Sequence, residues 1–309
     1  MYKYKIIITS LLVNLSLLVL TSYSYAIPSC SPASSQCGCR NLSVNQVIQL
    51  PNYNFLDTST STTYLTLSIE CRSNTAGSVT FDVSVNNTSG YILLNAGNSL
   101  SFDIFQPNSN TVVLGQGTNA YTHVQPTNSN NYQTFTLSFP TKILENQNVP
   151  PAAYSNTYIL SVNYPLYQGG NQQDNFPITF QTIVDKACIV SVSDLNFGEY
   201  DPNSNIDLTS SGSFIFQCSP GISTSFYLTP IQQGTISDRI LTNGPNQLHY
   251  NLYTDSNFST IFGNTNEGSP LSHTTNGNTQ SINYYGKIPA NQNVQSGTYT
   301  DMQSVSIDF

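Results

Sequence analysis

The chain has 309 residues, a formal net charge of −8 and only 8% charged residues. It offers no basic surface of the kind that nucleic-acid-binding proteins use, so no nucleic-acid partner is expected. Lys and Glu are scarce, and Ser, Thr, Asn, Gln and Tyr are abundant. This composition favours β-sheets over amphipathic helices, and the length fits two domains.

Residues 1–26 have the features of a secretory signal peptide. Lys3 and Lys5 precede an apolar stretch, residues 6–20, and the small residues around Ala26 suit cleavage before Ile27. The alternative, an uncleaved membrane helix, is weakened by the short apolar core. Cleavage would remove two basic residues and leave a charge of 6 − 16 = −10.

Beyond this segment the sequence repeats one pattern twice. The first copy contains Leu100, Phe102, Ile104, Leu114, Lys142-Ile143 and residues 146–149; the second contains Leu248, Tyr250, Leu252, Phe262, Lys287-Ile288 and residues 291–294. The register aligns Tyr154 with Tyr299 and Tyr164 with Phe309. We therefore predict two domains, residues 27–184 and 185–309.

The repeat also predicts how the six cysteines pair. Cys71 aligns with Cys218, and each follows another cysteine at about the same spacing. In an exported protein, cysteines are expected to form disulfides. The predicted pairs are Cys39–Cys71, Cys188–Cys218 and, from the remaining two, Cys30–Cys37. A zinc site at residues 37–39 lacks nearby histidine, so no metal or other cofactor is expected.

Alternation of apolar and polar residues indicates strands throughout. It is clear in residues 80–85, 135–139 and 305–309, whereas residues 107–110 and 126–131 have the composition of loops. No helical period of useful length follows the signal peptide. The predicted fold is all-β, with two tandem immunoglobulin-like β-sandwich domains.

The second copy resembles the spore coat protein U domain, the pilin fold of archaic chaperone–usher pili. The resemblance rests on Cys188-Ile189-Val190, Leu195-Asn196-Phe197-Gly198, Cys218, Tyr285-Gly286-Lys287-Ile288-Pro289 and residues 297–309. The first copy is more divergent, with Pro140-Thr141 at the place of Tyr285-Gly286. The resemblance implies a sandwich without its last strand, whose groove is filled first by a periplasmic chaperone and then by an adjacent pilin subunit as strand donor. An outer-membrane usher is then a further partner.

The first copy continues past Tyr164 into a further alternating segment. Its residues Phe176, Ile178, Phe180 and Val184 share one face. We predict that this strand, residues 176–184, completes the first domain in cis; an ordinary interdomain linker is the alternative. The Pro- and Ser-rich stretch before Cys39 makes a poor donor. A subunit that accepts a strand and donates none is expected at the distal end of a fibre.

Two surfaces are candidates for function. The resemblance implies an acceptor groove in the second domain. Its candidate residues are Ile189, Val192, Leu195, Val305, Ile307 and Phe309, with ordinary core positions as the alternative. The carboxylate of the last residue would anchor the chain in the chaperone. Adhesion is expected at loops 106–132 and 165–174 of the first domain, through Tyr121, Val124, Leu166 and Tyr167. These residues would otherwise cap the sandwich.

The leading hypothesis is a pilus tip adhesin that attaches to a host or abiotic surface and supports biofilm formation. A structural shaft subunit or spore-coat-like surface protein, without a receptor, is one alternative. A free secreted lectin-like protein is another. No enzyme is expected, because His123, His249 and His273 lie in unrelated contexts that suggest no catalytic arrangement.

Overall fold

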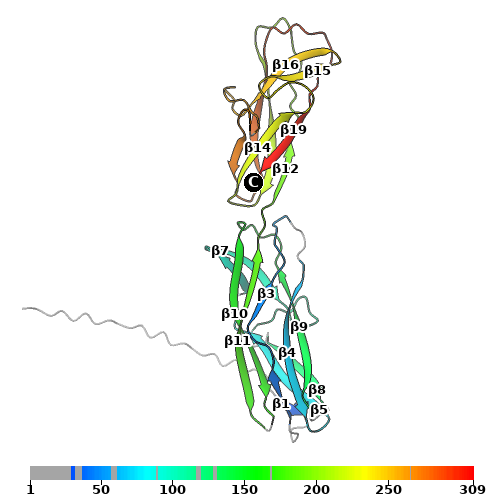
Figure 1. Ribbon diagram of the computed structural model, residues 1–309, viewed down its shortest axis with the longest axis vertical. Helices are drawn as coiled ribbons and strands as arrows, with labels where there is room; N and C mark the ends of the chain where they lie inside the picture. Colours follow the sequence, from blue (N-terminus) through cyan, green and yellow to red (C-terminus); the bar gives the residue numbers. More distant parts are fainter. Residues whose placement is uncertain are drawn as a thin grey trace, which may run out of the picture.

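The computed structural model describes residues 29–31, 37–56, 61–87, 90–115, 120–127, 131–167, 169–264 and 266–309, so the predicted signal peptide lies outside it. These residues form nineteen strands and no helix, and none of them belongs to a helix that could cross a membrane. The strands build two domains arranged end to end (Figure 1). The all-β, two-domain prediction is confirmed.

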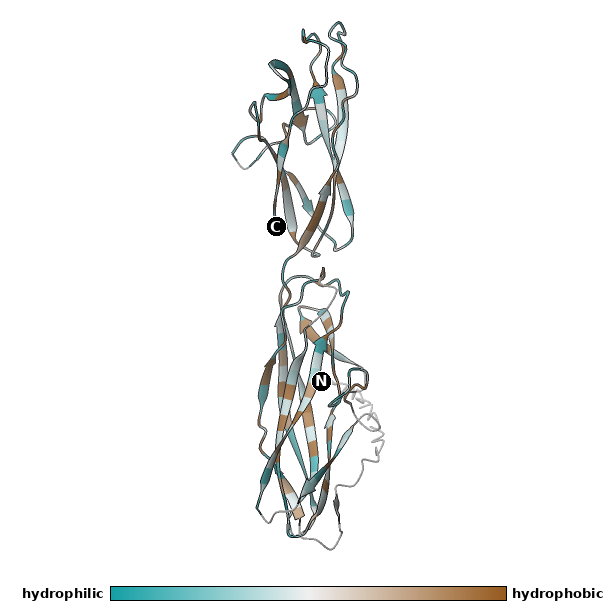
Figure 2. Cartoon of the chain, turned by 90° about the vertical axis from the view of Figure 1, so that its right-hand side faces the viewer, coloured by the Kyte–Doolittle hydropathy of each residue, from teal (hydrophilic) through white to brown (hydrophobic). Residues whose placement is uncertain are grey.

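The first domain is a single curled sheet of eleven strands. The strands are β1 Ser29–Ser31, β2 Cys37–Asn41, β3 Gln46–Gln49, β4 Thr63–Ser73, β5 Gly77–Val85, β6 Tyr91–Asn95, β7 Asn98–Ile104, β8 Tyr121–Thr127, β9 Gln133–Ile143, β10 Ala153–Pro165 and β11 Asn171–Ile183. Their main order is β1-β5-β10-β6-β7-β9-β4-β2, with β8 on β5. Figure 2 shows apolar and polar residues alternating along these strands, as expected for strands with one buried face.

Strand β11 closes this domain. It pairs with β10 in an antiparallel ladder of thirteen residue pairs and with β3 in a parallel ladder of four. The pairing to the β3 side continues beyond β3, because the Leu50 amide donates to the Gln181 carbonyl (2.8 Å) and the Tyr53 amide donates to the Ile183 carbonyl (2.9 Å). Strand β11 therefore lies between two partners along much of its length.

The second domain is a two-layer sandwich. Its strands are β12 Cys188–Val192, β13 Leu208–Cys218, β14 Ser223–Pro230, β15 Arg239–Asn243, β16 Asn246–Tyr253, β17 Leu271–Thr274, β18 Gln280–Ile288 and β19 Gln303–Asp308. One sheet has the order β12-β13-β18-β16-β15 and the other β17-β14-β19. Strand β19 forms a ladder only with β14 among the strands that the structure describes.

The two domains repeat side-chain hydrogen bonds as well as strands. The bonds that recur at equivalent positions are Gln147 Nε2 to the Ser101 carbonyl and Gln292 Nε2 to the His249 carbonyl (both 2.8 Å), and Tyr154 Oη to the Pro150 carbonyl and Tyr299 Oη to the Gln295 carbonyl (both 2.9 Å). The internal alignment of the sequence thus corresponds to one shared framework.

In each domain an equivalent disulfide joins two neighbouring strands. Cys39–Cys71 links β2 to β4, and Cys188–Cys218 links β12 to β13, each with a Cα–Cα distance of 4.0 Å. Cys37 is also disulfide-bonded. The side chain of Cys30, its predicted partner, lies outside the described residues.

The junction between the domains is short and held on both sides. The Asp185 amide donates to the Tyr53 carbonyl (2.9 Å), and the Ala187 amide donates to Ser219 Oγ (2.9 Å). Only Lys186 lies between these two anchored residues. Figure 1 shows β11 running toward the junction and the carboxyl terminus lying at the junction end of the second domain.

Candidate functional site

The residues predicted to complete the first domain lie in its core. Phe176, Ile178, Phe180 and Val184 are all buried and belong to its hydrophobic cluster. Thr182, on the same face of β11, is buried too and donates a hydrogen bond through Oγ1 to the Pro51 carbonyl (2.6 Å). This face of β11 is therefore part of the interior of the domain.

Phe180 belongs to a cluster of four aromatic rings. Its ring centroid lies 5.0 Å from that of Phe102 and 6.3 Å from that of Tyr158, and Tyr91 lies 5.4 Å from Phe102. The Tyr91 hydroxyl donates to the Leu114 carbonyl (2.5 Å), and burial raises the pKa of this tyrosine. Strand β11 thus supplies one member of the ring cluster.

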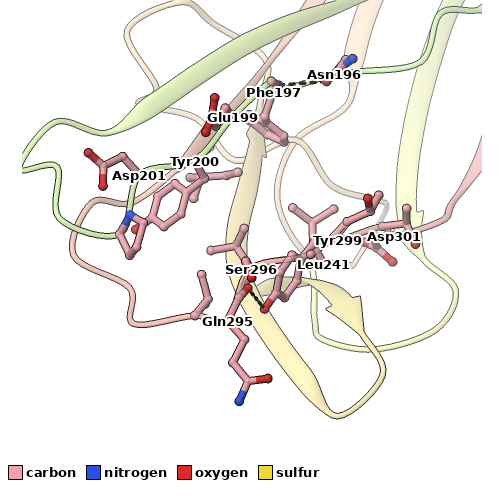
Figure 3. Close-up of a pocket in the computed structure, with 18 of the residues that line it drawn as sticks. Asn196, Phe197, Glu199, Tyr200, Asp201, Leu241, Gln295, Ser296, Tyr299 and Asp301 are labelled. Carbon is pink, nitrogen blue, oxygen red and sulfur yellow. Dashed lines mark hydrogen bonds between the residues drawn. The ribbon is translucent and has the colours of Figure 1, made fainter.

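The second domain has a groove at its far end, away from the junction. Residues 194–202 line one side and residues 294–301 the other, with Leu241, Leu248 and Ile288 between them, and the cavity volume is about 1190 Å³. Figure 3 shows Phe197, Glu199 and Tyr200 on one segment and Gln295, Ser296 and Tyr299 on the other. The floor is apolar, whereas Asp194, Glu199, Asp201 and Asp301 contribute carboxylates and no Lys or Arg lines the groove.

This groove occupies the place that β11 fills in the first domain. Residues 195–198 follow Cys188 at the spacing by which β3 follows Cys39, and β3 is the parallel partner of β11. Residues 195–198 form no ladder with any described strand. The exposures differ accordingly: Tyr154 is fully buried but its equivalent Tyr299 is half-buried. Tyr164 is 5% exposed and its equivalent Phe309 44%.

The predicted groove residues separate into three groups. Val192, Leu195 and Ile307 are half-buried and pack against the core cluster, and Leu195 also lines the groove. Val305 and Phe309 are exposed on the face of the terminal segment that Ile307 shares. Ile189 neither packs against the core cluster nor lines the groove.

Ile189 points away from the core and is 58% exposed. Residues alternate along β12, and the disulfide-bonded Cys188 faces inward, so Val190 and Val192 face inward with it. Val190, which was not a predicted residue, packs against the core cluster but does not line the groove. The parity with Cys188 was the signal that would have identified it.

The sequence also gave no indication of a buried arginine in the core of the second domain. Arg239 is fully buried, and its five N–H groups are used: Nε donates to Gln303 Oε1, Nη1 to the Ile236 carbonyl and Asn251 Oδ1, and Nη2 to the Leu228 and Phe262 carbonyls, at 2.6–3.0 Å. Burial lowers the pKa of Arg239 to about 10. Arg239 pairs with Tyr250 as Tyr91 pairs with Phe102, so the repeat register identifies it as the counterpart of Tyr91.

The candidate adhesion residues lie at the opposite end of the molecule, and two were assigned to the wrong kind of element. Tyr121 and Val124 belong to strand β8, which pairs with β5, rather than to a loop. Tyr121 packs on the core, with its ring 5.8 Å from that of Phe139, because it lies on the inward face. Val124 lies on the outward face and is 55% exposed.

Leu166 and Tyr167 lie in the loop between β10 and β11. Leu166 is exposed, whereas the ring of Tyr167 is covered by the guanidinium of Arg72, 3.5 Å from the ring centroid. The loop crosses β2 at Gly38, where a Cβ atom would collide with the Tyr167 backbone. The Arg72 guanidinium also lies 4.6 Å from the ring centroid of Tyr132. Of the four predicted residues, Val124 and Leu166 are therefore the ones that present apolar surface.

The described residues hold no group of three or more His, Cys, Asp or Glu side chains suited to a metal ion. His249 Nδ1 lies 2.8 Å from Asp238 Oδ1, but both side chains are exposed on the surface. His123 contacts Tyr121 and Gln125 along strand β8.

Comparisons with known proteins agree with this architecture. The Spore Coat Protein U domain model matches residues 21–161 and again residues 174–306. Protein U of Myxococcus xanthus is 34% identical over 128 residues, which cover 37% of this chain and 71% of that protein.

Among solved structures, the chain is similar to the complex of the chaperone CsuC with the tip adhesion subunit CsuE, from the archaic chaperone–usher Csu pili of Acinetobacter baumannii. That likeness has a TM-score of 0.55 at 15% identity and covers 88% of this chain and 100% of the other, which shows a shared fold. The chain belongs to the spore coat protein U domain family, because the family model matches both of its copies.

Proposed function

We propose that this two-domain member of the family is the tip adhesin of an archaic chaperone–usher pilus. Its second domain accepts a donor strand from a periplasmic chaperone and then, at the outer-membrane usher, from the adjacent subunit. The observation that carries this proposal is the groove of the second domain, which lies where β11 lies in the first. In the first domain, β11 lies in that place and pairs with strands on both sides.

Filling the groove would be strongly favourable. An incoming strand would cover the half-buried side chains of Leu195, Phe197 and Tyr299 and pair with the open edge of β19. Each large apolar side chain that the donor buries contributes about 1.5–3 kcal/mol. Three or four such side chains are comparable to the whole stability of an ordinary domain, about 5–15 kcal/mol.

The amino-terminal segment supports a position at the end of the fibre. Ser29–Ser31, which precede Cys39, form β1, which pairs with β5 of the same domain at residues 78–80. This segment is therefore held within its own domain and is not presented as a free donor. With β11 used in the first domain as well, the chain accepts one strand and donates none.

The surface for attachment is the pole of the first domain opposite the junction, where β8 and the loop after β10 lie (Figure 1). Val124 and Leu166 expose apolar side chains there. Such groups bind host or abiotic surfaces by burial of apolar area, and biofilm formation is the role that this attachment would serve. The pilus places the protein outside the cell, after export through the periplasm.

Immunogold electron microscopy of the assembled pili tests the position. A tip adhesin gives label at one end, whereas label along the shaft supports the structural alternative without a receptor. An adhesion assay tests whether the pole is the attachment surface. The double variant Val124→Ser, Leu166→Ser should reduce attachment several-fold while the number of pili stays constant. Ile206→Ser is the matched control, because Ile206 is an exposed apolar residue of the second domain.

A further inference from the structure

The pole of the first domain carries a stack of arginine and tyrosine side chains on the outward face of its sheet. Gly38 pairs with Arg72 in the ladder between β2 and β4, and Tyr132 lies on the β9 side of Arg72, just beyond the ladder between β4 and β9. The backbone of Tyr167 lies against Gly38. The Arg72 guanidinium therefore stands between two rings, 4.6 Å from the ring centroid of Tyr132 and 3.5 Å from that of Tyr167.

Arg72 has aromatic neighbours but no polar partner. The residue is half-buried, and its Nε atom is buried without a hydrogen-bond partner. None of the ion pairs formed by the described residues includes Arg72. Buried polar groups of proteins are normally hydrogen-bonded, so an unpaired guanidinium at the surface of a binding domain indicates a partner from outside the chain.

Arg40 contacts the same ring but differs in having a partner. Its guanidinium lies 4.4 Å from the ring centroid of Tyr132, and its Nε donates to Glu70 Oε2 (2.7 Å). The other carboxylate oxygen of Glu70 accepts a hydrogen bond from Thr134 Oγ1 (3.1 Å). Glu70 thus neutralises Arg40 and leaves the charge of Arg72 unpaired. Residues 27–184 contain three basic residues, and two of them lie in this stack.

The geometry of the stack decides which ligand group fits. Rings on both sides of the guanidinium leave its N–H edge as the open direction of approach. That edge presents parallel donors that match the two oxygens of a carboxylate. The nearby residues Asn74 and Asn131 are exposed and uncharged. These surroundings suit a carboxylate set among hydroxyl groups, as in a uronic acid unit of a polysaccharide.

We propose that Arg72, held between Tyr132 and Tyr167, binds the carboxylate of an acidic polysaccharide. The exposed side chain of Leu166 directly precedes Tyr167, so an apolar contact and an ionic contact are adjacent in the same loop. This inference rests on the proposed attachment role of the pole and adds the class of ligand.

Binding of the purified full mature chain to immobilised polygalacturonate, measured by biolayer interferometry at low salt, tests the proposal. We expect at least tenfold weaker binding to the methyl ester of the polymer, which has no charge. Arg72→Met should weaken binding to the acid form about tenfold, as expected for the loss of a charge-assisted pair. Lys142→Met makes the same change of net charge at the other end of β9 and should leave binding unchanged.

Arg72→Lys separates binding from support of the loop, because lysine keeps the charge beside the rings but lacks the planar fork. It should preserve the Tm and recover less than half of the lost affinity, and full recovery would overturn recognition by the guanidinium. Absence of binding by the unaltered chain, equal binding to the ester, or full binding by Arg72→Met would overturn the site.

Two further polymers test the class of ligand. Polyglutamate that binds as tightly as polygalacturonate would overturn the assignment to a saccharide, and dextran sulfate that binds as tightly would overturn the assignment to a carboxylate. The position in the fibre is tested separately. Immunogold label along the shaft, with polymer binding through Arg72 intact, would overturn the tip position and support this site.

Discussion

The two domains share one framework but differ in how completely it is closed. In the first, β11 covers the edge, and both Tyr154 and Tyr164 are buried. In the second, the equivalents Tyr299, which lines the groove, and Phe309, at the junction end, remain partly exposed. The repeated disulfide and the repeated glutamine and tyrosine hydrogen bonds form in both. The framework therefore does not depend on the closing strand, which mainly supplies burial.

The domains also organise their interiors differently at the same alignment position. The first places Tyr91 there, in contact with the rings of Phe102 and Tyr158. The second places Arg239, whose guanidinium binds groups on β14, β16 and β19 and so connects the two sheets. At this one position the second domain has a set of hydrogen bonds where the first has packed aromatic rings.

The largest expected effect on stability comes from removing β11, the strand that closes the first domain and has no counterpart in the second. Deletion of residues 171–184 from the full chain should unfold the first domain, because four core side chains, each contributing about 1.5–3 kcal/mol, are lost together. Differential scanning calorimetry should then show only the transition of the second domain. The peptide of residues 171–184, added in trans, should restore the first transition.

Single substitutions on the two faces of β11 provide the control. Phe180→Ala should cost the first domain about 3–5 kcal/mol, whereas Gln181→Ala, on the exposed face, should stay within about 0.5 kcal/mol. A first domain that keeps its transition without residues 171–184 would show that β11 is an ordinary linker.

The exchange of aromatic packing for hydrogen bonds is tested at the paired positions 91 and 239. Arg239→Met leaves the Leu228 and Phe262 carbonyls without their donor, so we expect the second domain to lose about 3–5 kcal/mol. Tyr91→Phe removes one hydrogen bond and keeps the ring, and should cost the first domain about 1–2 kcal/mol. Chemical denaturation followed by tyrosine fluorescence measures both values.

Arg239→Lys distinguishes charge from geometry, because lysine keeps the charge but has three donors in place of five. Recovery of full stability with lysine would mean that the charge alone matters. Equal losses for Arg239→Met and Tyr91→Phe would contradict the contrast between the two interiors.

The smallest expected effect concerns Tyr164, whose equivalent Phe309 has no hydroxyl. Tyr164 Oη donates to Asp174 Oδ2 (2.7 Å), and burial, with help from this carboxylate, raises the pKa of Tyr164 to about 12. Because the folded pKa lies above the ordinary value of 10.0, its contribution is complete below pH 10 and is lost as the pH rises toward 12.

Tyr164→Phe should therefore cost the first domain about 1–2 kcal/mol at neutral pH and flatten the alkaline fall of its Tm. Thermal unfolding at steps between pH 9 and about pH 12 measures this difference. An unchanged alkaline profile in the variant would rule out Tyr164 as a source of the pH dependence.

Much of this architecture could be predicted because period-two alternation and an internal repeat are local signals. The alternation of β11 is one example. Strand β8 could not be predicted, since a polar segment with Pro126 has the composition of a loop and only its ladder with β5 makes it a strand. Arg239 could not be predicted as a core residue, because arginine is rarely buried and its partners are carbonyls from distant segments.

The continuity of β11 with the junction has a mechanical consequence. Tension between an attached pole and the rest of a fibre would pass along β11, through Lys186, into β12 (Figure 1). The pull is directed along the thirteen-pair ladder with β10, so the hydrogen bonds share the load in shear rather than breaking one after another. If the pole attaches to a surface as proposed, the segment that closes the first domain is also the one that would carry the tension.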